Sequence, residues 1–412
     1  MRTSIKFSLF LGLALLVAGK AHSSGFQLNE YSSTGLGRAF AGAGIVGDDY
    51  SAIAFNPAGM ALKGTGGQMG VSLIEIHSDT RGHIHPNGAP GTKITGPKGK
   101  MRLYKALPHG FAQYKINEDA RIGLGVYTPF GLASVYNSDW FGSSHGIRTE
   151  LEVVDTALAG SYKLTDDVTF GAAIIYRYVH GNLINSLFPD AGSRNQMDLS
   201  GWEFAYNFGL MYELSKDTRF GVAYRLNTAH TVKGTHSITG YGTMPGLNGR
   251  YPASSQMTLP DQLTISAYHR LNDKFGLSGT ARWTEWSTFD VFVLESDRTG
   301  PSYIEERWKD VWTLSAGIDY YHSPEWTFRA GFSDDPTPVK SATYRTARIP
   351  DTDRTWVTLG ASYKHKNMTV DFGYAHLFME TAMMHNSDAH TTINAKSSSL
   401  SNMYAIQFQY DF

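Results

Sequence analysis

Hydrophobic and polar residues alternate with a period of two along the last stretch of the chain. The apolar positions are Tyr404, Ile406, Phe408, Tyr410 and Phe412, and the positions between them are Ala405, Gln407, Gln409 and Asp411. Such a strand presents one face to an apolar environment and the other to a polar one. We therefore expect a strand over residues 399–412 with one face in an apolar environment and the other in a polar one.

The same design recurs at six tight turns, where a strand ends in an aromatic residue, a short polar turn follows and a new strand begins. The segments begin at Tyr114, Tyr162, Tyr212, Tyr268, Tyr320 and Tyr363. Asp, Asn, Ser and Lys in these turns suit short hairpins. Longer polar segments, predicted to be loops, lie near 79–102, 134–149, 183–199, 234–256, 293–303, 341–349 and 383–397.

Six hairpins supply twelve strands, and a first strand near 67–77 and the C-terminal strand complete fourteen. An even number of antiparallel strands, with short turns at one end and long loops at the other, is typical of bacterial outer-membrane barrels. Aromatic residues beside the turns suit the two membrane interfaces. The pattern predicts an all-β fold, a 14-stranded antiparallel transmembrane β-barrel over residues 66–412, in preference to a soluble protein built of hairpins.

The N-terminus indicates export. Arg2 and Lys6 precede an apolar run over 7–19, and a small-residue ending makes residues 1–23 a predicted signal peptide. No later apolar run reaches the length of about 18 residues that a helical span needs. A closed β-barrel is then the structure that can satisfy the hydrogen bonds of the backbone within lipid. We expect the cell outer membrane of a Gram-negative bacterium, and the net charge of -1 argues against nucleic acid as a partner.

Residues 24–65 read differently from the predicted wall. Five glycines between 35 and 47 interrupt every helical or strand period, so this segment cannot form a core by itself. A barrel of fourteen strands is wide enough to leak if it is empty. We predict that residues 24–65 form an N-terminal hatch inside the barrel. At its end, Pro57 restricts Asn56 and leaves the Asn56 amide free to bond the wall, so Asn56, Pro57 and Ala58 are the predicted latch.

Three motifs resemble a known family. The start of the mature chain (GFQLNEYSSTGLGRAFAGAG), the Asn56-Pro57-Ala58 triplet and IPDTDRTW at 349–356 are similar to the outer-membrane long-chain fatty acid transporters of the FadL family. The resemblance implies a barrel with a hatch that passes hydrophobic molecules without an energy source. It implies no cofactor, and partners limited to fatty acids, outer-membrane lipid and lipopolysaccharide. We expect a monomer, with a phage or surface receptor role compatible with transport.

The third predicted strand contains Pro129, Phe130 and Gly131. Proline cannot donate to a sheet and glycine adds no side chain, so this strand should kink. The resemblance implies that such a kink forms a lateral opening, through which ligand leaves into the bilayer. A bulge without a function is the alternative.

Ligand-binding residues are predicted in two places. In the predicted loop 183–199, Leu183, Ile184, Leu187 and Phe188 form an apolar cluster that is either a landing groove or packing against the barrel rim. A fatty acid carboxylate needs a cation within an apolar pocket.

By resemblance, the family's inward basic residues fall at Asn185 and Ile304, where this chain has none. Arg177, Arg307 and Lys309 are the nearby substitutes, although each is also explained as an ordinary lumen or rim charge. The hydroxyl of Thr128 could donate a hydrogen bond to the ligand, and Phe26 is predicted to contact the ligand tail.

Two alternatives remain at this point. One is a channel for other hydrophobic compounds, such as aromatic hydrocarbons, on the same scaffold. The other is an outer-membrane lipid hydrolase, although the sequence has no nucleophile motif and we predict that the protein is not an enzyme. His83 and His85 have no third ligand nearby in the sequence, so no metal is expected.

Overall fold

The computed structural model describes residues 25–412, so the predicted signal peptide over 1–23 lies outside the described residues. Within them, nineteen strand segments form one closed antiparallel sheet. The segments are β1 (Gly66–Pro86), β2 (Gly99–Lys115), β3 (Ala120–Val135), β4 (Arg148–Lys163), β5 (Val168–Leu187), β6 (Asp190–Ser215), β7 (Thr218–Leu226), β8 (Ala229–Thr239), β9 (Gly249–Thr258), β10 (Gln262–Arg270), β11 (Phe275–Thr284), β12 (Val291–Ser296), β13 (Ser302–Glu305), β14 (Val311–Tyr321), β15 (Trp326–Asp335), β16 (Arg354–His365), β17 (Met368–Met379), β18 (Ala382–Ser387) and β19 (Thr391–Asp411).

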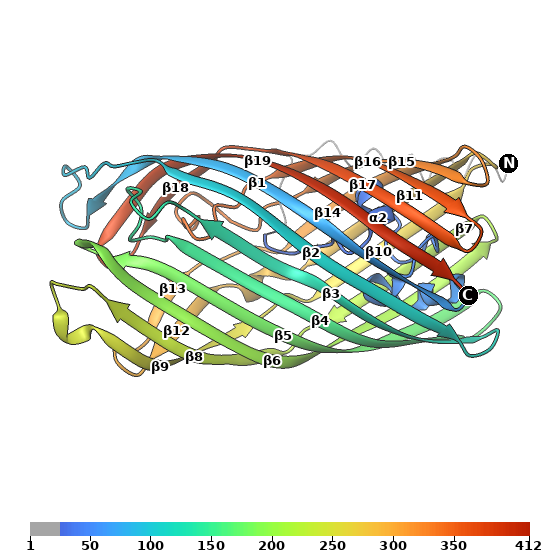
Figure 1. The fold of residues 1–412 in the computed structure, drawn as a ribbon, viewed down its shortest axis with the longest axis horizontal. Coiled ribbons are helices and arrows are strands. Elements are labelled where there is room, and N and C mark those ends of the chain that lie inside the picture. The colour runs from blue at the N-terminus through green and yellow to red at the C-terminus, as the bar shows by residue number, and fades with distance from the viewer. Residues whose placement is uncertain (1–24) are drawn as a thin grey trace.

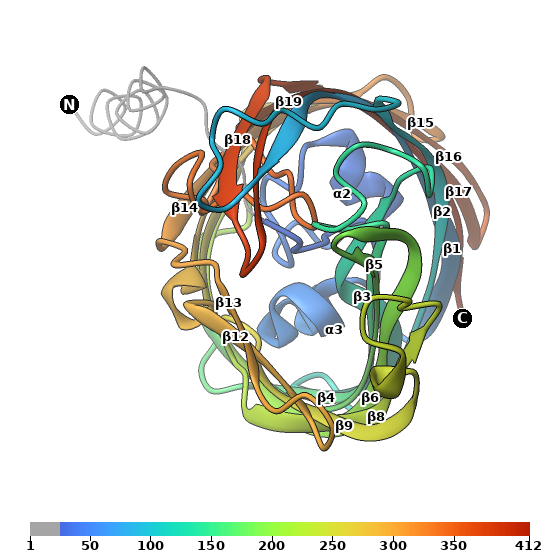
Figure 2. The same ribbon diagram turned by 90° about the vertical axis from the view of Figure 1, so that its left-hand side faces the viewer.

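Fourteen barrel strands arise from these described segments because five strands are interrupted. The interrupted strands are β7 with β8, β9 with β10, β11 with β12, β13 with β14, and β17 with β18. For example, β6 pairs with both β7 and β8, and β19 pairs with both β17 and β18. β1 pairs with β19 along its whole length and closes the barrel. Figures 1 and 2 show the resulting cylinder from the side and from one end. The predicted fold and its strand number are confirmed.

The six predicted tight turns are all present, but the strands continue much further beyond the membrane region than predicted. The segment 183–199 is not a loop, because β5 and β6 form a long hairpin joined only through Phe188 and Pro189. Polar residues are frequent near the end of this hairpin, so its sequence lacks the regular alternation that marks a strand, although Leu183, Met197 and Leu199 are buried on its inward face.

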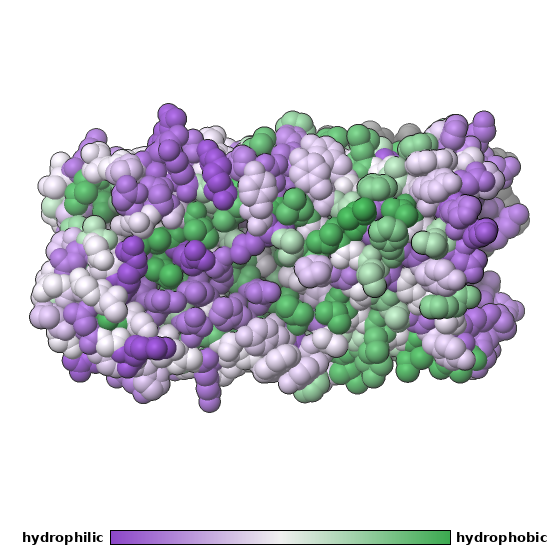
Figure 3. Space-filling model, in the orientation of Figure 1, coloured by the Kyte–Doolittle hydropathy of each residue, from purple (hydrophilic) through white to green (hydrophobic). Residues whose placement is uncertain are grey.

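The outer surface of the barrel carries the predicted apolar band. In β19, Tyr404, Ile406, Phe408 and Tyr410 are 37–47% exposed, whereas Gln407 is fully buried between them. Figure 3 shows apolar residues gathered in a region to the right of the centre, with hydrophilic residues at the right-hand end and over most of the left side. The alternation predicted for the last strand is therefore confirmed.

Residues 25–65, which we call the luminal segment, lie inside the ring of strands (Figure 2). The segment contains α2 (Ser33–Gly37), α3 (Ala52–Phe55) and the 3-10 helix η2 (Pro57–Leu62). Two further short helices, η3 (Pro245–Leu247) and η4 (Trp286–Thr288), belong to the wall and its loops. None of the helices in residues 25–412 has the length and apolar character that a membrane span requires.

Charged and polar contacts fix the luminal segment to the wall. Arg38 pairs with Asp48 of the segment at 2.7 Å and with Asp319 of β14 at 2.9 Å. The backbone N–H of Ser33 donates to Oε1 of Gln407 in β19 at 2.8 Å. The segment therefore bonds both to β19, a strand of the closing pair, and to the more distant β14.

Candidate functional site

Strand β3 leaves its neighbour β2 halfway along the wall. The pairing between them runs only from Lys115↔Arg121 to Gly110↔Val126. On its other side, β3 shifts register against β4 between Tyr127 and Phe130, so that two residues, Thr128 and Pro129, face Val154 alone. The predicted kink at this strand is therefore present as a bulge.

The luminal segment takes the place of β2 beside the kink. The N–H of Leu28 donates to the carbonyl of Pro129 at 2.8 Å, and the N–H of Gly131 donates to the carbonyl of Phe26 at 3.0 Å. Gln27 forms a β-bridge with Phe130. These bonds satisfy backbone groups that β2 leaves unpaired, as buried polar groups require.

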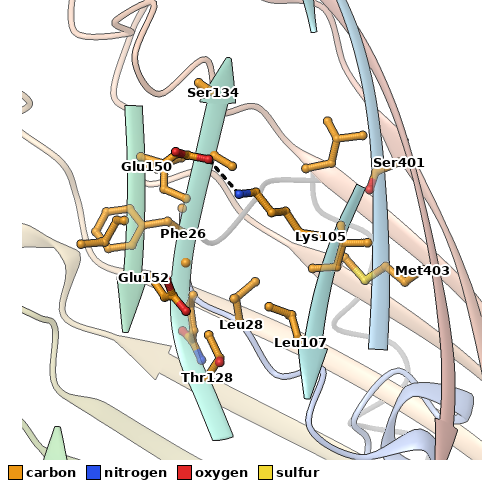
Figure 4. Close-up of a pocket in the computed structure, with 18 of the residues that line it drawn as sticks. Phe26, Leu28, Lys105, Leu107, Thr128, Ser134, Glu150, Glu152, Ser401 and Met403 are labelled. Atoms are coloured by element: carbon orange, nitrogen blue, oxygen red, sulfur yellow. Dashed lines mark hydrogen bonds and ion pairs between the residues drawn. The ribbon is translucent and has the colours of Figure 1, made fainter. Parts of the chain in front are cut away.

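A cavity of about 560 Å³, which we call the wall cavity, lies where β2 and β3 separate. Ligand sites in proteins are commonly 300–1,000 Å³. Its lining includes residues from both faces of the wall, because Tyr127 and Val153 are buried toward the lumen while their neighbours Val126 and Val154 line the cavity from the outer face. Lumen-facing residues also line it, among them Phe26, Leu28 and Met403 (Figure 4). The cavity therefore extends through the wall.

A smaller apolar pocket, the inner pocket, shares five lining residues with the wall cavity. The shared residues are Phe26, Leu132, Glu150, Leu151 and Ile349. The remaining apolar lining comes from Val179, Leu183, Leu199, Val232, Met257, Phe289, Phe292 and Ile304. Phe26 stands at the junction, with its ring centroid 4.7 Å from that of Trp286 and 5.6 Å from that of Trp308. A long apolar ligand could thus contact both spaces.

Arg348 supplies a cation to the inner pocket. Its guanidinium donates to Oγ1 of Thr149 at 3.3 Å and to Oδ1 of Asn185 at 2.9 Å, both uncharged acceptors. Burial lowers the pKa of Arg348 to about 10, which leaves it protonated at neutral pH. Glu306 also lines the pocket and accepts hydrogen bonds from Trp308 Nε1 and Thr346 Oγ1.

The predicted basic residues are not available to a ligand in this pocket. Arg177 is fully buried and is satisfied by Asp155 at 2.6 Å, Glu203 at 3.1 Å and Asn227 at 2.7 Å. Arg307 and Lys309 are exposed, and Arg307 pairs with Glu305 at 2.9 Å. Glu306 and Trp308, which lie in the same segment between β13 and β14, are buried instead.

Arg348 was not among the predicted ligand-binding residues, although Asn185 and Ile304, which lie beside it, were the positions where a cation was expected. The guanidinium of Arg348 bonds Asn185, and Ile304 lines the same pocket, so a cation reaches these two positions from a different segment. The available signal was the position of Arg348 directly before the IPDTDRTW motif.

The four apolar residues near 183–188 do not form one cluster. Leu183 is buried in the inner pocket, whereas Ile184, the next residue of β5, is on the opposite face of the strand. Leu187 and Phe188 lie at the hairpin end and line neither cavity. Of the remaining predicted residues, Thr128 and Gly131 line the wall cavity, while Pro129 and Phe130 are buried in the kink.

The Asn56-Pro57-Ala58 turn sits against three wall glycines, which we call the glycine socket. These are Gly171 in β5, Gly209 in β6 and Gly221 in β7. Nδ2 of Asn56 donates to the carbonyls of Leu210 at 3.2 Å and Val222 at 3.4 Å, and its Oδ1 accepts from the N–H of Ala58 at 3.1 Å. A Cβ at Gly209 would lie 2.0 Å from Oδ1 of Asn56. The sequence signal was a Phe-Gly pair repeated in all three strands.

Comparison with known proteins agrees with this architecture. The family model of the outer membrane protein transport proteins (OMPP1/FadL/TodX) matches residues 14–412. Outer membrane protein P1 of Haemophilus influenzae is 28% identical over 98% of this chain and 99% of its own. The long-chain fatty acid transport protein of Escherichia coli K12 is 29% identical over 90% of this chain and 91% of its own.

Solved structures support the same fold. A crystal structure of a Pseudomonas aeruginosa FadL homologue has a TM-score of 0.88 at 25% identity, and covers 94% of this chain and 100% of that one. The Pseudomonas putida toluene transporter TodX is similar in fold, with a TM-score of 0.67 at 18% identity over 95% of this chain and 100% of that one. Of these, the Escherichia coli protein and TodX are named as transport proteins. The chain therefore belongs to the OMPP1/FadL/TodX family of outer-membrane transport proteins, and it lies in the outer membrane.

Proposed function

We propose that the protein carries long-chain fatty acids passively across the outer membrane. The ligand enters from the loop end, rests with its head group at the inner pocket and its tail in the wall cavity, and leaves sideways between β2 and β3. The observation that carries this proposal is the wall cavity, which is lined from both faces of the wall and meets the inner pocket at Phe26. A hydrophobic ligand can follow this route without crossing the polar contacts around the luminal segment.

Arg348 favours a carboxylate as the ligand's head group. A half-buried cation whose hydrogen bonds go to neutral groups gains from an anionic partner, because charge-assisted hydrogen bonds are stronger than neutral ones. Thr149 and Asn185 orient the guanidinium toward the pocket. Oleate fits this description, with its carboxylate at Arg348 and its chain along Leu183, Phe26 and Leu151.

Deletion of Pro129 tests the lateral route. Removal of one residue would bring β3 back into continuous register with β4, because Tyr127 pairs with Asp155 and Phe130 pairs with Val153. We expect oleate uptake by cells to fall toward that of cells without the protein, while oleate binding to the purified barrel persists. Pro129→Ala keeps the bulge and should keep most of the uptake. Full uptake by the deletion variant would contradict lateral release.

Arg348→Met tests the head group. Loss of hydrogen bonds to a charged group costs about 1.5–3 kcal/mol, which weakens binding roughly 10- to 100-fold. We expect this loss for oleate but not for methyl oleate, which has the same tail without the charge. Arg348→Lys is the control, since it keeps the charge. Equal loss for both ligands would assign Arg348 to packing instead.

A second candidate is a channel for aromatic hydrocarbons. It is favoured by the ring cluster around Phe26, in which Trp308 lies 4.8 Å from Phe289 between ring centroids. Binding of toluene that exceeds that of oleate, and that is indifferent to Arg348→Met, would favour this candidate.

A further inference from the structure

An ion pair crosses the wall cavity between β2 and β4. Nζ of Lys105 in β2 lies 2.7 Å from Oε1 of Glu150 in β4. Strand β3 lies between those two strands in the sheet, so the pair spans the strand that has moved inward. Figure 4 shows the contact running across the strand that carries Thr128 and Ser134.

The pair is accessible to solvent. The side chain of Lys105 is 46% exposed and that of Glu150 is 24% exposed. Exposed ion pairs contribute little to stability, so this contact can open without loss of the fold. Glu150 also accepts a hydrogen bond from Nη1 of Arg148 at 2.8 Å, so it keeps a cationic partner when Lys105 leaves. Lys105 is therefore able to exchange its partner.

Both charges lie along the proposed exit route. Glu150 lines the inner pocket as well as the wall cavity, whereas Lys105 lines only the wall cavity. Arg354, another cation in the wall cavity, is already paired with Asp335 at 3.1 Å. A carboxylate that leaves Arg348 for the membrane thus passes Glu150 first, which repels it, and then meets Lys105.

We propose that Lys105 receives the carboxylate of the departing ligand by displacing Glu150. The charge of the ligand then has a partner within the opening between β2 and β3 while its tail enters the apolar part of the bilayer. Exit through the wall would consequently favour anionic amphipathic ligands over neutral hydrocarbons. This inference rests on the proposed function and adds a specificity-determining residue to its last step.

The test compares Lys105→Met and Glu150→Gln with wild type and with Lys100→Met, an exposed lysine on the same strand that does not line the cavity. Uptake by cells is measured for oleate and for methyl oleate, and equilibrium binding of oleate is measured on purified barrels. Native folding of each variant is checked by its heat-dependent gel mobility.

Lys105→Met should lower oleate uptake roughly two- to fivefold, the range expected for an exposed ion pair. Methyl oleate uptake and oleate binding at equilibrium should be unchanged in that variant. Glu150→Gln should equal or exceed wild type for oleate, because Lys105 no longer has a competing anion. The Lys100→Met control should match wild type for both ligands.

Two outcomes would overturn the proposal. If both variants raise the uptake of both ligands, the ion pair only obstructs the opening between β2 and β3. If Lys105→Met leaves oleate uptake unchanged, the lysine has no part in exit. In either case, oleate transport by wild type and its loss on deletion of Pro129 would still support the proposed function. Failure of wild type to carry oleate would instead reject the proposed function itself.

Discussion

Asp155→Ala is expected to destabilise the barrel by about 3–5 kcal/mol, the cost of removing one partner from a buried ion pair. Asp155 is fully buried and accepts hydrogen bonds from Arg177 at 2.6 and 3.0 Å and from Arg225 at 3.1 Å. Without it, Arg225 keeps only the hydroxyl of Tyr127 and the carbonyl of Ala54 as bonded partners among residues 25–412.

The free energy of unfolding would be measured by urea titration in lipid vesicles with tryptophan fluorescence. Glu152→Ala is the matched control, because Glu152 belongs to the same strand but is exposed. We expect the control to stay within about 0.5 kcal/mol of wild type, as surface substitutions usually do. Similar losses for the two variants would show that the burial of Asp155 has no energetic consequence.

Deletion of residues 24–60 is expected to convert a closed barrel into a steadily conducting pore. The luminal segment fills the ring of strands in Figure 2, and a barrel of this size is wide enough to conduct once it is emptied. Asp319 and Arg329, which contact the segment, remain paired with each other at 3.1 Å after the deletion. Single-channel conductance in planar bilayers and uptake of a large antibiotic by cells would measure the effect.

A milder variant guards against failure of the deletion to fold. Gly209→Val places a side chain where Oδ1 of Asn56 now lies and should loosen the luminal segment, with intermittent conductance as the result. Gly181→Val is the control, because a Cβ at Gly181 meets no atom closer than 4.0 Å. Unchanged conductance in both the deletion and Gly209→Val would contradict the hatch as a barrier.

The number of strands could be predicted because it depends on local chemistry. Each tight turn carries its own turn residues, and each membrane strand alternates between lipid and lumen. Strand lengths could not be predicted beyond the membrane, since the many polar residues near the hairpin end of β5 and β6 resemble those of a loop. The kink at Pro129 was predictable for a similar local reason, because proline removes a donor from the sheet.

The ligand site was predicted less well because it depends on which neighbouring side chains point inward and on contacts between segments far apart in the sequence. Arg307 and Lys309 are exposed while Glu306 and Trp308 are buried, and this segment lies between β13 and β14, where no strand alternation marks which side chains face inward. Arg348 belongs to an irregular segment whose position is set by tertiary contacts, so no period in the sequence marks it. The ion pair of Lys105 with Glu150 joins residues that only the kink brings together.

The luminal segment also constrains how the protein can assemble. Only three residues separate the end of η2 at Leu62 from the start of β1 at Gly66, and β1 forms the closing seam with β19. On the inner side of that seam, Gln68 accepts from the N–H of Tyr50 and Gln407 accepts from the N–H of Ser33. Both strands of the seam are thus bonded to the luminal segment on their inner side. A seam that forms without the segment lacks these contacts, so filling the barrel helps to hold it shut.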